Sequence, residues 1–317
     1  MSKTALVFGS NGQDGSFICK SLLEKKYKVI GVSKSKNKIS TNHALLGIQE
    51  NIVYEATNIN DYKKVTEIIE NYQPDEIYNL AAQSSVGQSF SSPKETIEGI
   101  VNGTLNLLET SRRIGYSGRV FFAGSSEMFG NTETGADINH KHHPKSPYAI
   151  GKQTSFNLVK LYREIYNVKC MTGVLFNHES SLRPKTFVTQ KIINAAKNIS
   201  KGNINILKLG NLNVIRDWGW APEYVEAIQL IAKAKVIKDQ VICTGEANSL
   251  KKFVEKVFTA YNLNCEEHIE IDKSLFRPSE IEQNYGNPEP LFKDLRWKAK
   301  ESLNSIIEKL IERSSIN

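Results

Sequence analysis

Long apolar runs are absent from this sequence of 317 residues, and none approaches the roughly 20 residues that cross a bilayer. The first residues, MSKTALVFG, enter a strand-like run at once and do not resemble a signal peptide. The cysteines are few and without paired spacing, which indicates free thiols and neither a disulfide framework nor a metal site; they are Cys19, Cys170, Cys243 and Cys265. We therefore expect a cytoplasmic protein without a membrane partner.

Blocks of like charge are also absent, although 41 Lys and Arg outweigh 34 Asp and Glu and give a net charge of +7. No five consecutive side chains share a sign. A solvated lysine-rich surface explains this balance, and so does a mild field that attracts an anionic small molecule. We expect no nucleic-acid partner.

The pattern of elements predicts an α/β fold. Short β-branched runs alternate with helical periodicity, which is typical of a doubly wound, Rossmann-like parallel sheet. The predicted strands are TALVFG, KVIGV, NIVYEA, DEIYNLA, RVFFAG and KCMTGVLFN. The predicted helices between them are GSFICKSLLEKK, DYKKVTEIIENY, PKETIEGIVNGTLNLLETSRR and SPYAIGKQTSFNLVKLYREIY.

The length favours about two domains. Beyond the predicted sheet the pattern is irregular, with the run NINILKLG and with helices near 187–200, 222–235 and 299–313. We expect residues 1–176, with about 213–245, to form the Rossmann domain. Residues of about 177–212 and 246–317 would form a smaller substrate-binding lobe.

A glycine loop, FGSNGQDGSF, lies between the first strand and the first helix. Gly9 permits the turn, Gly12 lets a pyrophosphate approach the backbone, and Gly15 allows close packing of helix on strand. The N–H groups of the helix N-terminus would then meet the phosphates. The alternative is a glycine-rich turn that binds nothing.

The second strand ends in Ser33, Lys34, Ser35 and Lys36, where a NAD site usually has an acidic residue. Two lysines and two hydroxyls suit a 2′-phosphate, so we expect NADP rather than NAD. The alternative is a lysine-rich loop.

Tyr148 and Lys152 lie four residues apart on a predicted helix and share one face. An ammonium group beside the phenol would lower the pKa of Tyr148 and allow it to accept a hydroxyl proton near a nicotinamide. Glu127 follows Ser125 and Ser126 where a predicted buried strand ends. It is either a general base at the mouth of a cleft or an exposed turn or capping residue.

With these residues the chain resembles an extended short-chain dehydrogenase/reductase, and within that group the GDP-mannose 4,6-dehydratases. The resemblance extends over nearly the whole chain. Its motifs are GSNGQDGSF, PDEIYNLAAQSSVGQSF, GTLNLLE, SSEMFG, SPYAIGK, LYREIYNVKC, LFNHESSLRPKTFVTQKI, LGNLNVIRDWG, YVEAIQL and LFRPSEIE.

The resemblance implies transient oxidation of a GDP-sugar at carbon 4, loss of water, and return of hydride to carbon 6. Tyr148 would accept the hydroxyl proton, with Lys152 tuning it. Ser125 would bind the oxygen at carbon 4, and Glu127 would remove the proton from carbon 5.

The resemblance also implies binding residues. Those for NADP are Gly9, Asn11, Gly12, Gln13, Asp14, Gly15, Ser33, Lys34, Asn58, Ile59, Leu80, Ala81, Ala82, Tyr148, Lys152 and His178. Those for the GDP-sugar are Ser84, Ser85, Asn177, Val188, Lys191, Asn211, Arg216, Arg277 and Glu280. No metal site is expected.

Several departures from the family pattern leave the sugar open between GDP-mannose and a related GDP-manno-heptose. The loop after the second strand is shortened, so a homodimer through the helices near 94–113 and 147–166 is favoured over a tetramer. A 4-ketosugar reductase or an epimerase is the alternative activity, and neither needs a base at Glu127. A cofactor-binding regulator without activity is a third reading.

Overall fold

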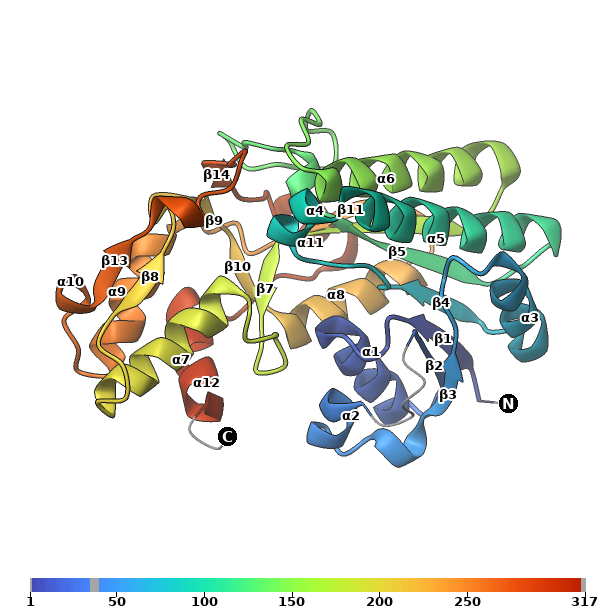
Figure 1. The fold of residues 1–317 in the computed structure, drawn as a ribbon. Coiled ribbons are helices and arrows are strands. Elements are labelled where there is room, and N and C mark those ends of the chain that lie inside the picture. The colour runs from blue at the N-terminus through green and yellow to red at the C-terminus, as the bar shows by residue number, and fades with distance from the viewer. Residues whose placement is uncertain (1, 35–39, 315–317) are drawn as a thin grey trace.

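The protein is described by a computed structural model that covers residues 2–34 and 40–314. Its central sheet has seven parallel strands in the order β3-β2-β1-β4-β5-β6-β11 (Figure 1). These strands are β1 (Thr4–Phe8), β2 (Lys28–Ser33), β3 (Val53–Ala56), β4 (Glu76–Asn79), β5 (Arg119–Ser125), β6 (Cys170–Leu175) and β11 (Gln240–Ile242). The predicted Rossmann-like α/β class is confirmed. The order reverses between β1 and β4, where such sheets bind ligands at the carboxyl ends of their strands.

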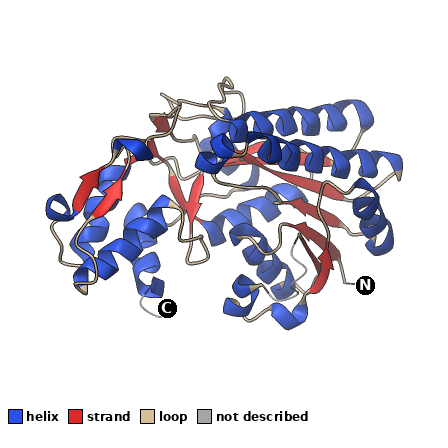
Figure 2. Cartoon of the chain, in the orientation of Figure 1, coloured by secondary structure: helices blue, strands red, loops and turns tan. Residues whose placement is uncertain are grey.

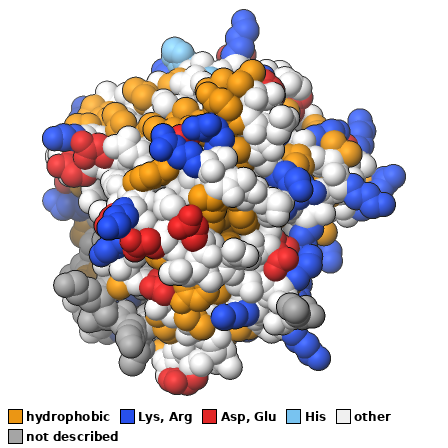
Figure 3. Space-filling view, turned by 90° about the vertical axis from the view of Figure 1, so that its right-hand side faces the viewer, with side chains coloured by type: hydrophobic (Ala, Val, Ile, Leu, Met, Phe, Trp, Pro, Cys, Tyr) orange, Lys and Arg blue, Asp and Glu red, His pale blue; other side chains and the backbone are white. Residues whose placement is uncertain are grey.

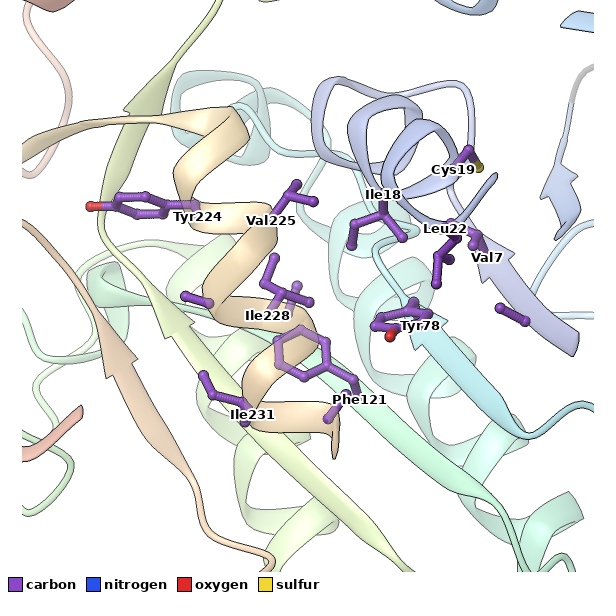
Figure 4. Packing of buried hydrophobic residues seen from close by; sticks show 14 of the residues in the cluster. Val7, Ile18, Cys19, Leu22, Tyr78, Phe121, Tyr224, Val225, Ile228 and Ile231 are labelled. Atoms are coloured by element: carbon purple, nitrogen blue, oxygen red, sulfur yellow. The ribbon is translucent and has the colours of Figure 1, made fainter. Parts of the chain in front are cut away.

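Helices cover both faces of the sheet (Figure 2). One face carries α1 (Gln13–Glu24) and α8 (Ala221–Lys233), and the other carries α3 (Tyr62–Tyr72), α5 (Pro93–Arg113) and α6 (Pro147–Tyr166). Along β1, Val7 faces the first layer and Leu6 the second, since neighbouring strand residues point to opposite faces. Figure 4 shows the first layer, in which Ile18 and Leu22 of α1 and Ile228 of α8 contribute to one apolar cluster.

Short helical segments connect these elements and were not predicted. They are α2 (Thr41–Leu45), η1 (Gln49–Asn51), α4 (Val86–Ser91) and η2 (Ser126–Met128). Each has six residues or fewer, too short for helical periodicity to show in the sequence. The η2 turn follows β5 directly and carries Glu127.

A second apolar core lies outside the sheet, in the part on the left of Figure 1. It is formed by α7 (Val188–Ser200), α9 (Leu250–Ala260) and α12 (Leu303–Ser314), with β8 (Leu207–Leu209) paired to β13 (Ile269–Ile271). Two short elements accompany them, α10 (Cys265–His268) and η3 (Lys273–Leu275). The predicted helices near 187–200 and 299–313 are confirmed, and α9 was not predicted.

Very short strands join this core to the sheet. The pair is β7 (Asn177–Glu179) with β10 (Trp218–Trp220), and the triplet places β9 (Ile215–Arg216) between β12 (Asn248–Ser249) and β14 (Gln283–Asn284). After β14 the chain returns to the sheet through α11 (Glu289–Leu295), whose Leu291 packs in the first-layer cluster. The chain therefore crosses between the two cores several times.

The described residues contain no helix that is long and apolar enough to span a membrane. They also contain no group of three or more His, Cys, Asp or Glu placed to hold a metal ion. The four cysteines are unpaired. On the face shown in Figure 3, Lys and Arg lie in several separate groups, with acidic and apolar side chains between them.

Candidate active site

The candidate site is a cavity of about 520 Å³ at the carboxyl end of the sheet, between the two cores. Its walls come from the glycine loop, the ends of β4, β5 and β6, the start of α6, and residues of the second core. A larger cavity, of about 680 Å³, opens at the opposite end of the strands beside Lys3, Asp75 and Arg119. No residue predicted to bind or react lines that larger cavity, so we place the candidate site in the smaller one, called here the active-site cavity.

The glycine loop is shaped by backbone contacts. Gly9 has φ +81°, and a Cβ there would lie 2.7 Å from the carbonyl carbon of Leu80. A Cβ on Gly15 would lie 2.2 Å from the carbonyl oxygen of Gly9. Gly12 is the N-cap of α1, and no side chain among the described residues caps that helix. Its first N–H groups are therefore open to an anion, as the sequence predicted for a pyrophosphate site.

The other predicted cofactor residues divide into two groups. Gln13, Asp14, Leu80, Ala82 and His178 line the active-site cavity with the three glycines, whereas Asn11, Ser33, Lys34, Asn58, Ile59 and Ala81 lie outside its lining.

Within the second group, Asn11 donates a hydrogen bond from Nδ2 to Ser33 Oγ at 3.0 Å. Lys34 and Asn58 are exposed, and Ser35 and Lys36 lie outside the described residues. The side chain of Ile59 is a core residue, 3% exposed, which leaves its backbone as the part that could meet a ligand.

Tyr148 and Lys152 both project into the cavity from α6. The helix begins as the sequence indicates, with Pro147 in its first turn and Ser146 Oγ accepting a hydrogen bond from the Ala149 N–H at 3.1 Å. Lys152 is buried, and its Nζ donates to the carbonyl oxygen of Ala123 at 2.7 Å. The same Nζ lies 5.6 Å from the centre of the Tyr148 ring.

The pKa values of this pair differ from the sequence prediction that Lys152 lowers the pKa of Tyr148. Burial raises the pKa of Tyr148 to about 12, although a hydrogen bond with Ser125 acts in the opposite direction. Burial also lowers the pKa of Lys152 to about 8. The prediction was wrong. Desolvation of the buried phenol raises the pKa of Tyr148, and the Lys152 ammonium group, which is bonded to Ala123, does not outweigh it.

Glu127 lies inside the active-site cavity and not on an open turn. Its residue is 9% exposed, and its N–H donates to Ser125 Oγ at 3.3 Å. Its Oε1 lies 3.9 Å from Nη1 of Arg277. Ser125, Glu127 and Tyr148 line one cavity, and the charge of Glu127 acts on the phenol.

Cationic side chains from the second core face these residues. Arg216 is 6% exposed, and its Nη2 donates to Glu280 Oε1 at 3.0 Å. Arg277 Nη1 lies 3.6 Å from the same oxygen. Burial lowers the pKa of Arg216, while Glu127 and Glu280 oppose the shift. Glu280 thus holds two arginines together at the cavity.

The remaining predicted substrate residues are placed as follows. Ser84, Ser85, Asn177, Val188 and Lys191 line the cavity. Lys191 Nζ donates to the carbonyl oxygen of Lys208 at 2.7 Å. Asn211 lies outside the lining, and its Oδ1 accepts a hydrogen bond from the Asn213 N–H at 2.9 Å.

Sequence reasoning missed a polar network across the cavity. His178 Nε2 lies 3.0 Å from both carboxylate oxygens of Asp14. Burial opposes the charged form of each, yet their attraction lowers the pKa of Asp14 and raises that of His178. The two were predicted as separate cofactor residues, because nothing in the sequence shows that α1 and β7 meet.

Arg183 was also missed. It lines the cavity, and its guanidinium carbon lies 3.9 Å from the centre of the Phe187 ring. The charge of Arg183 lowers the pKa of both Asp14 and Tyr148. It stands in an irregular loop, where a single arginine gives no periodic signal.

Comparisons with known proteins identify the family of the chain. A family model described as GDP-mannose 4,6 dehydratase matches residues 6–310. The chain is 36% identical to GDP-mannose 4,6 dehydratase 1 of Arabidopsis thaliana over 327 aligned positions, covering 98% of this chain and 89% of that protein. The chain belongs to the GDP-mannose 4,6-dehydratase family. The resemblance stated from the motifs is confirmed.

Solved structures place this member of the GDP-mannose 4,6-dehydratase family in a widely shared fold. The dTDP-glucose 4,6-dehydratase of Bacillus anthracis matches with a TM-score of 0.86 at 18% identity, over 100% of this chain and 97% of that one. The UDP-glucose 4-epimerase of Thermotoga maritima matches with a TM-score of 0.87 at 20% identity, over 99% and 100%. Proteins of this fold include both dehydratases and epimerases, so the fold does not decide between these activities and the residues of the site must.

Proposed function

We propose that this chain is a GDP-sugar 4,6-dehydratase that acts on GDP-mannose or a related GDP-manno-heptose. The observation that carries the proposal is the placement of Glu127 in one cavity with Ser125 and Tyr148. A sugar ring bound there would meet a base for its hydroxyl proton and a second base for a carbon-bound proton. The match of the family model over residues 6–310 supports the same activity.

A nicotinamide cofactor fits the residues present. The turn at Gly9 and the contact at Gly15 leave no space for side chains, which is how a loop receives a pyrophosphate. The predicted residues from Gly9 to Gly15 and from Leu80 to Ala82, with His178, would hold it. Such a cofactor supplies reversible hydride exchange, so a sugar can be oxidised at one carbon and reduced at another without net change.

The cofactor is proposed to be NADP. Ser33 ends β2 and Lys34 follows it, where NAD-binding sites usually carry an acidic residue. Lys34 is exposed and would meet a 2′-phosphate, and Asn11 orients the Ser33 hydroxyl. A Lys34→Ala variant should therefore lose affinity for NADP and keep its affinity for NAD.

Tyr148 is proposed to accept the proton from the hydroxyl at carbon 4. Its neighbour Lys152 lines the same cavity and would hold the nicotinamide ribose. Ser125, which hydrogen-bonds to the phenol, would hold the oxygen at carbon 4. The sugar becomes a 4-ketone at this stage.

Glu127 is proposed to remove the proton from carbon 5, which the adjacent ketone makes acidic. The hydroxyl group at carbon 6 would then leave as water with the proton that Glu127 has taken up. Carbon 6 would regain hydride and carbon 5 a proton from solvent, which completes the 4-keto-6-deoxy product. Arg216 and Arg277 suit the diphosphate, because a guanidinium fork can bind two phosphate oxygens. Lys191 would add a third positive charge at the same wall.

Incubation of the purified protein with GDP-mannose or a GDP-manno-heptose tests the proposal. Mass spectrometry should show a product lighter by one water, without consumption of added NADPH. An unchanged mass across a panel of GDP-sugars would contradict it.

The alternative is an NADP-dependent 4-ketosugar reductase or an epimerase, favoured by the epimerase that shares the fold. A Glu127→Gln variant separates the readings. In a dehydratase the rate of water loss should fall about 100-fold or more, because the variant has no base at this position. Cofactor binding should persist, because glutamine has nearly the same shape as glutamate. A reductase or epimerase should keep its activity.

The organisation of the molecule is part of the proposal. Residues 1–176 and about 213–245 would form the cofactor domain, and about 177–212 and 246–317 the substrate lobe. The two apolar cores support this division in outline, although Leu291 packs against the sheet and Trp218 packs in the second core. A homodimer through α5 and α6 is proposed, because Leu161 and Ile165 of α6 are 46% and 63% exposed. A cytoplasmic location is consistent with cysteines that are unpaired and mostly buried.

A further inference from the structure

The turn that carries Glu127 is held by a residue of β14, which lies far along the chain from it. Asn284 of β14 is 2% exposed. Its Nδ2 donates to the carbonyl oxygen of Gly130 at 2.8 Å and to that of Ser126 at 3.2 Å. One amide therefore bonds at both ends of the segment in which Glu127 stands.

The backbone of Asn284 is fixed at the same time to the strand that carries Arg216. In the pairing of β14 with β9, Asn284 lies opposite Arg216. The carbonyl oxygen of Asn284 accepts a hydrogen bond from the Asp217 N–H at 3.1 Å. Asp217 is itself fixed, since its carboxylate accepts bonds from Thr244 and Gly245.

The loop after Glu127 continues along the same strand. Thr132 donates its N–H to the carbonyl oxygen of Gln283 at 2.9 Å and its hydroxyl to that of Tyr285 at 2.9 Å. Gly130 has φ +72°, and a Cβ there would lie 2.5 Å from the carbonyl oxygen of His143. Gly130 and Thr132 thus restrain the turn at its far end, and Asn284 restrains it at both ends.

We infer that Asn284 is a positioning residue, which sets where the Glu127 carboxylate stands relative to Arg216. The inference rests on the proposed function, because it assigns Glu127 the removal of the proton from carbon 5. Among the described residues, removal of the amide would leave the buried Gly130 carbonyl group without a donor and the Ser126 carbonyl group with the Phe129 N–H alone, at 3.0 Å. The turn would then shift to reach water, and Glu127 would shift with it.

The role predicts a split between the two chemical stages. Tyr148 and Lys152 stand on α6, and Asn284 bonds to neither. Oxidation at carbon 4 should therefore continue in a variant without the amide, while water loss slows. Reduced nicotinamide, which the return of hydride to carbon 6 should keep at a low level in the wild type, should accumulate in the variant during a single turnover.

The variant for this test is Asn284→Leu, which is close in size and lacks the donor. We expect water loss from GDP-mannose to slow on the order of tenfold or more, with accumulation of reduced nicotinamide. We also expect faster amide hydrogen exchange in peptides that cover residues 126–130. Tyr285→Phe is the matched control, since Tyr285 follows Asn284 directly. It removes a bond from the Tyr285 hydroxyl to the Glu133 carbonyl oxygen and should change neither readout.

Asn284→Ser, which leaves room for water beside the two carbonyls, serves as the second variant if the leucine variant does not fold. It should show the same split more weakly. Wild-type rates of water loss and exchange in a folded variant would overturn the inference. If the wild type itself releases no water, the proposed function fails, and hydrogen exchange still reports whether Asn284 holds the turn.

Discussion

The effect of Lys152 on the pKa of Tyr148 depends more on where the ammonium group points than on its distance from the ring. Lys152 lies 5.6 Å from the ring centre, yet it donates to Ala123, and burial dominates both pKa values. The spacing of the two residues could be read from the sequence. Their pKa values could not, because desolvation depends on which segments close over the helix.

The depressed pKa of Lys152 makes stability depend on pH. An unfolded lysine keeps its proton up to about pH 10.5, and the folded one loses it near pH 8. Between these values the unfolded chain binds more protons, so the free energy of unfolding rises with pH. Tyr148 acts in the opposite sense, but above pH 10.

A Lys152→Met variant should lack this rise. Urea unfolding between pH 8 and pH 10 should show the wild type gaining up to roughly 2 kcal/mol relative to the variant. Parallel curves for the two proteins across that range would contradict the account.

Among the elements, the glycine loop with α1 was read correctly because its signal is local. Strand, turn and helix follow one another within about 20 residues, and the glycine spacing indicates where the backbone must turn tightly or pack closely. The helix α9 was missed although it has a helical pattern, in which Leu250, Phe253, Val254, Val257 and Phe258 are buried. Strands of two or three residues, such as β9 and β14, are defined by their partners and give no signal of their own.

Two alanine substitutions in the glycine loop should have different effects. Gly15→Ala places a Cβ 2.2 Å from backbone, so it should reduce stability by at least about 2 kcal/mol and weaken cofactor binding. Gly12→Ala has a Cβ 3.3 Å from its nearest neighbour and φ −73°, and it should weaken cofactor binding with little change in melting temperature. Thermal unfolding measures the stability of the two variants, and NADP titration measures their cofactor binding. Equal melting temperatures of the two variants would contradict the prediction.

At the scale of the whole molecule, the site exists because the chain crosses several times between two cores. Residues such as Arg183, Arg216 and Asn284 lie far along the sequence from Glu127. The motifs predicted which residue types face a nucleotide sugar, and Arg216, Arg277 and Lys191 do line the cavity. The contacts that hold them, such as Glu280 with Arg216, required the folded chain.

The proposed dimer gives a prediction at the same scale. Ile165→Glu places a charge on the exposed face of α6, where the residue is 63% exposed, and should convert a dimer to a monomer. Val236→Glu is the control, because Val236 is 64% exposed and lies between α8 and β11. Light scattering gives the molar mass of each variant in solution. A dimer that survives Ile165→Glu would place the interface elsewhere.

The central claim is that Glu127 and Tyr148 act on one sugar ring in one cavity, and the reaction in deuterium oxide tests it most directly. A carboxylate that removes the proton from carbon 5 exchanges with solvent before the carbon is protonated again. Mass spectrometry should therefore show a product that has lost one water and gained one solvent deuterium, and Glu127→Gln should abolish its formation. A wild-type product that loses water without gaining deuterium, or a Glu127→Gln variant that forms it at the wild-type rate, would contradict the account.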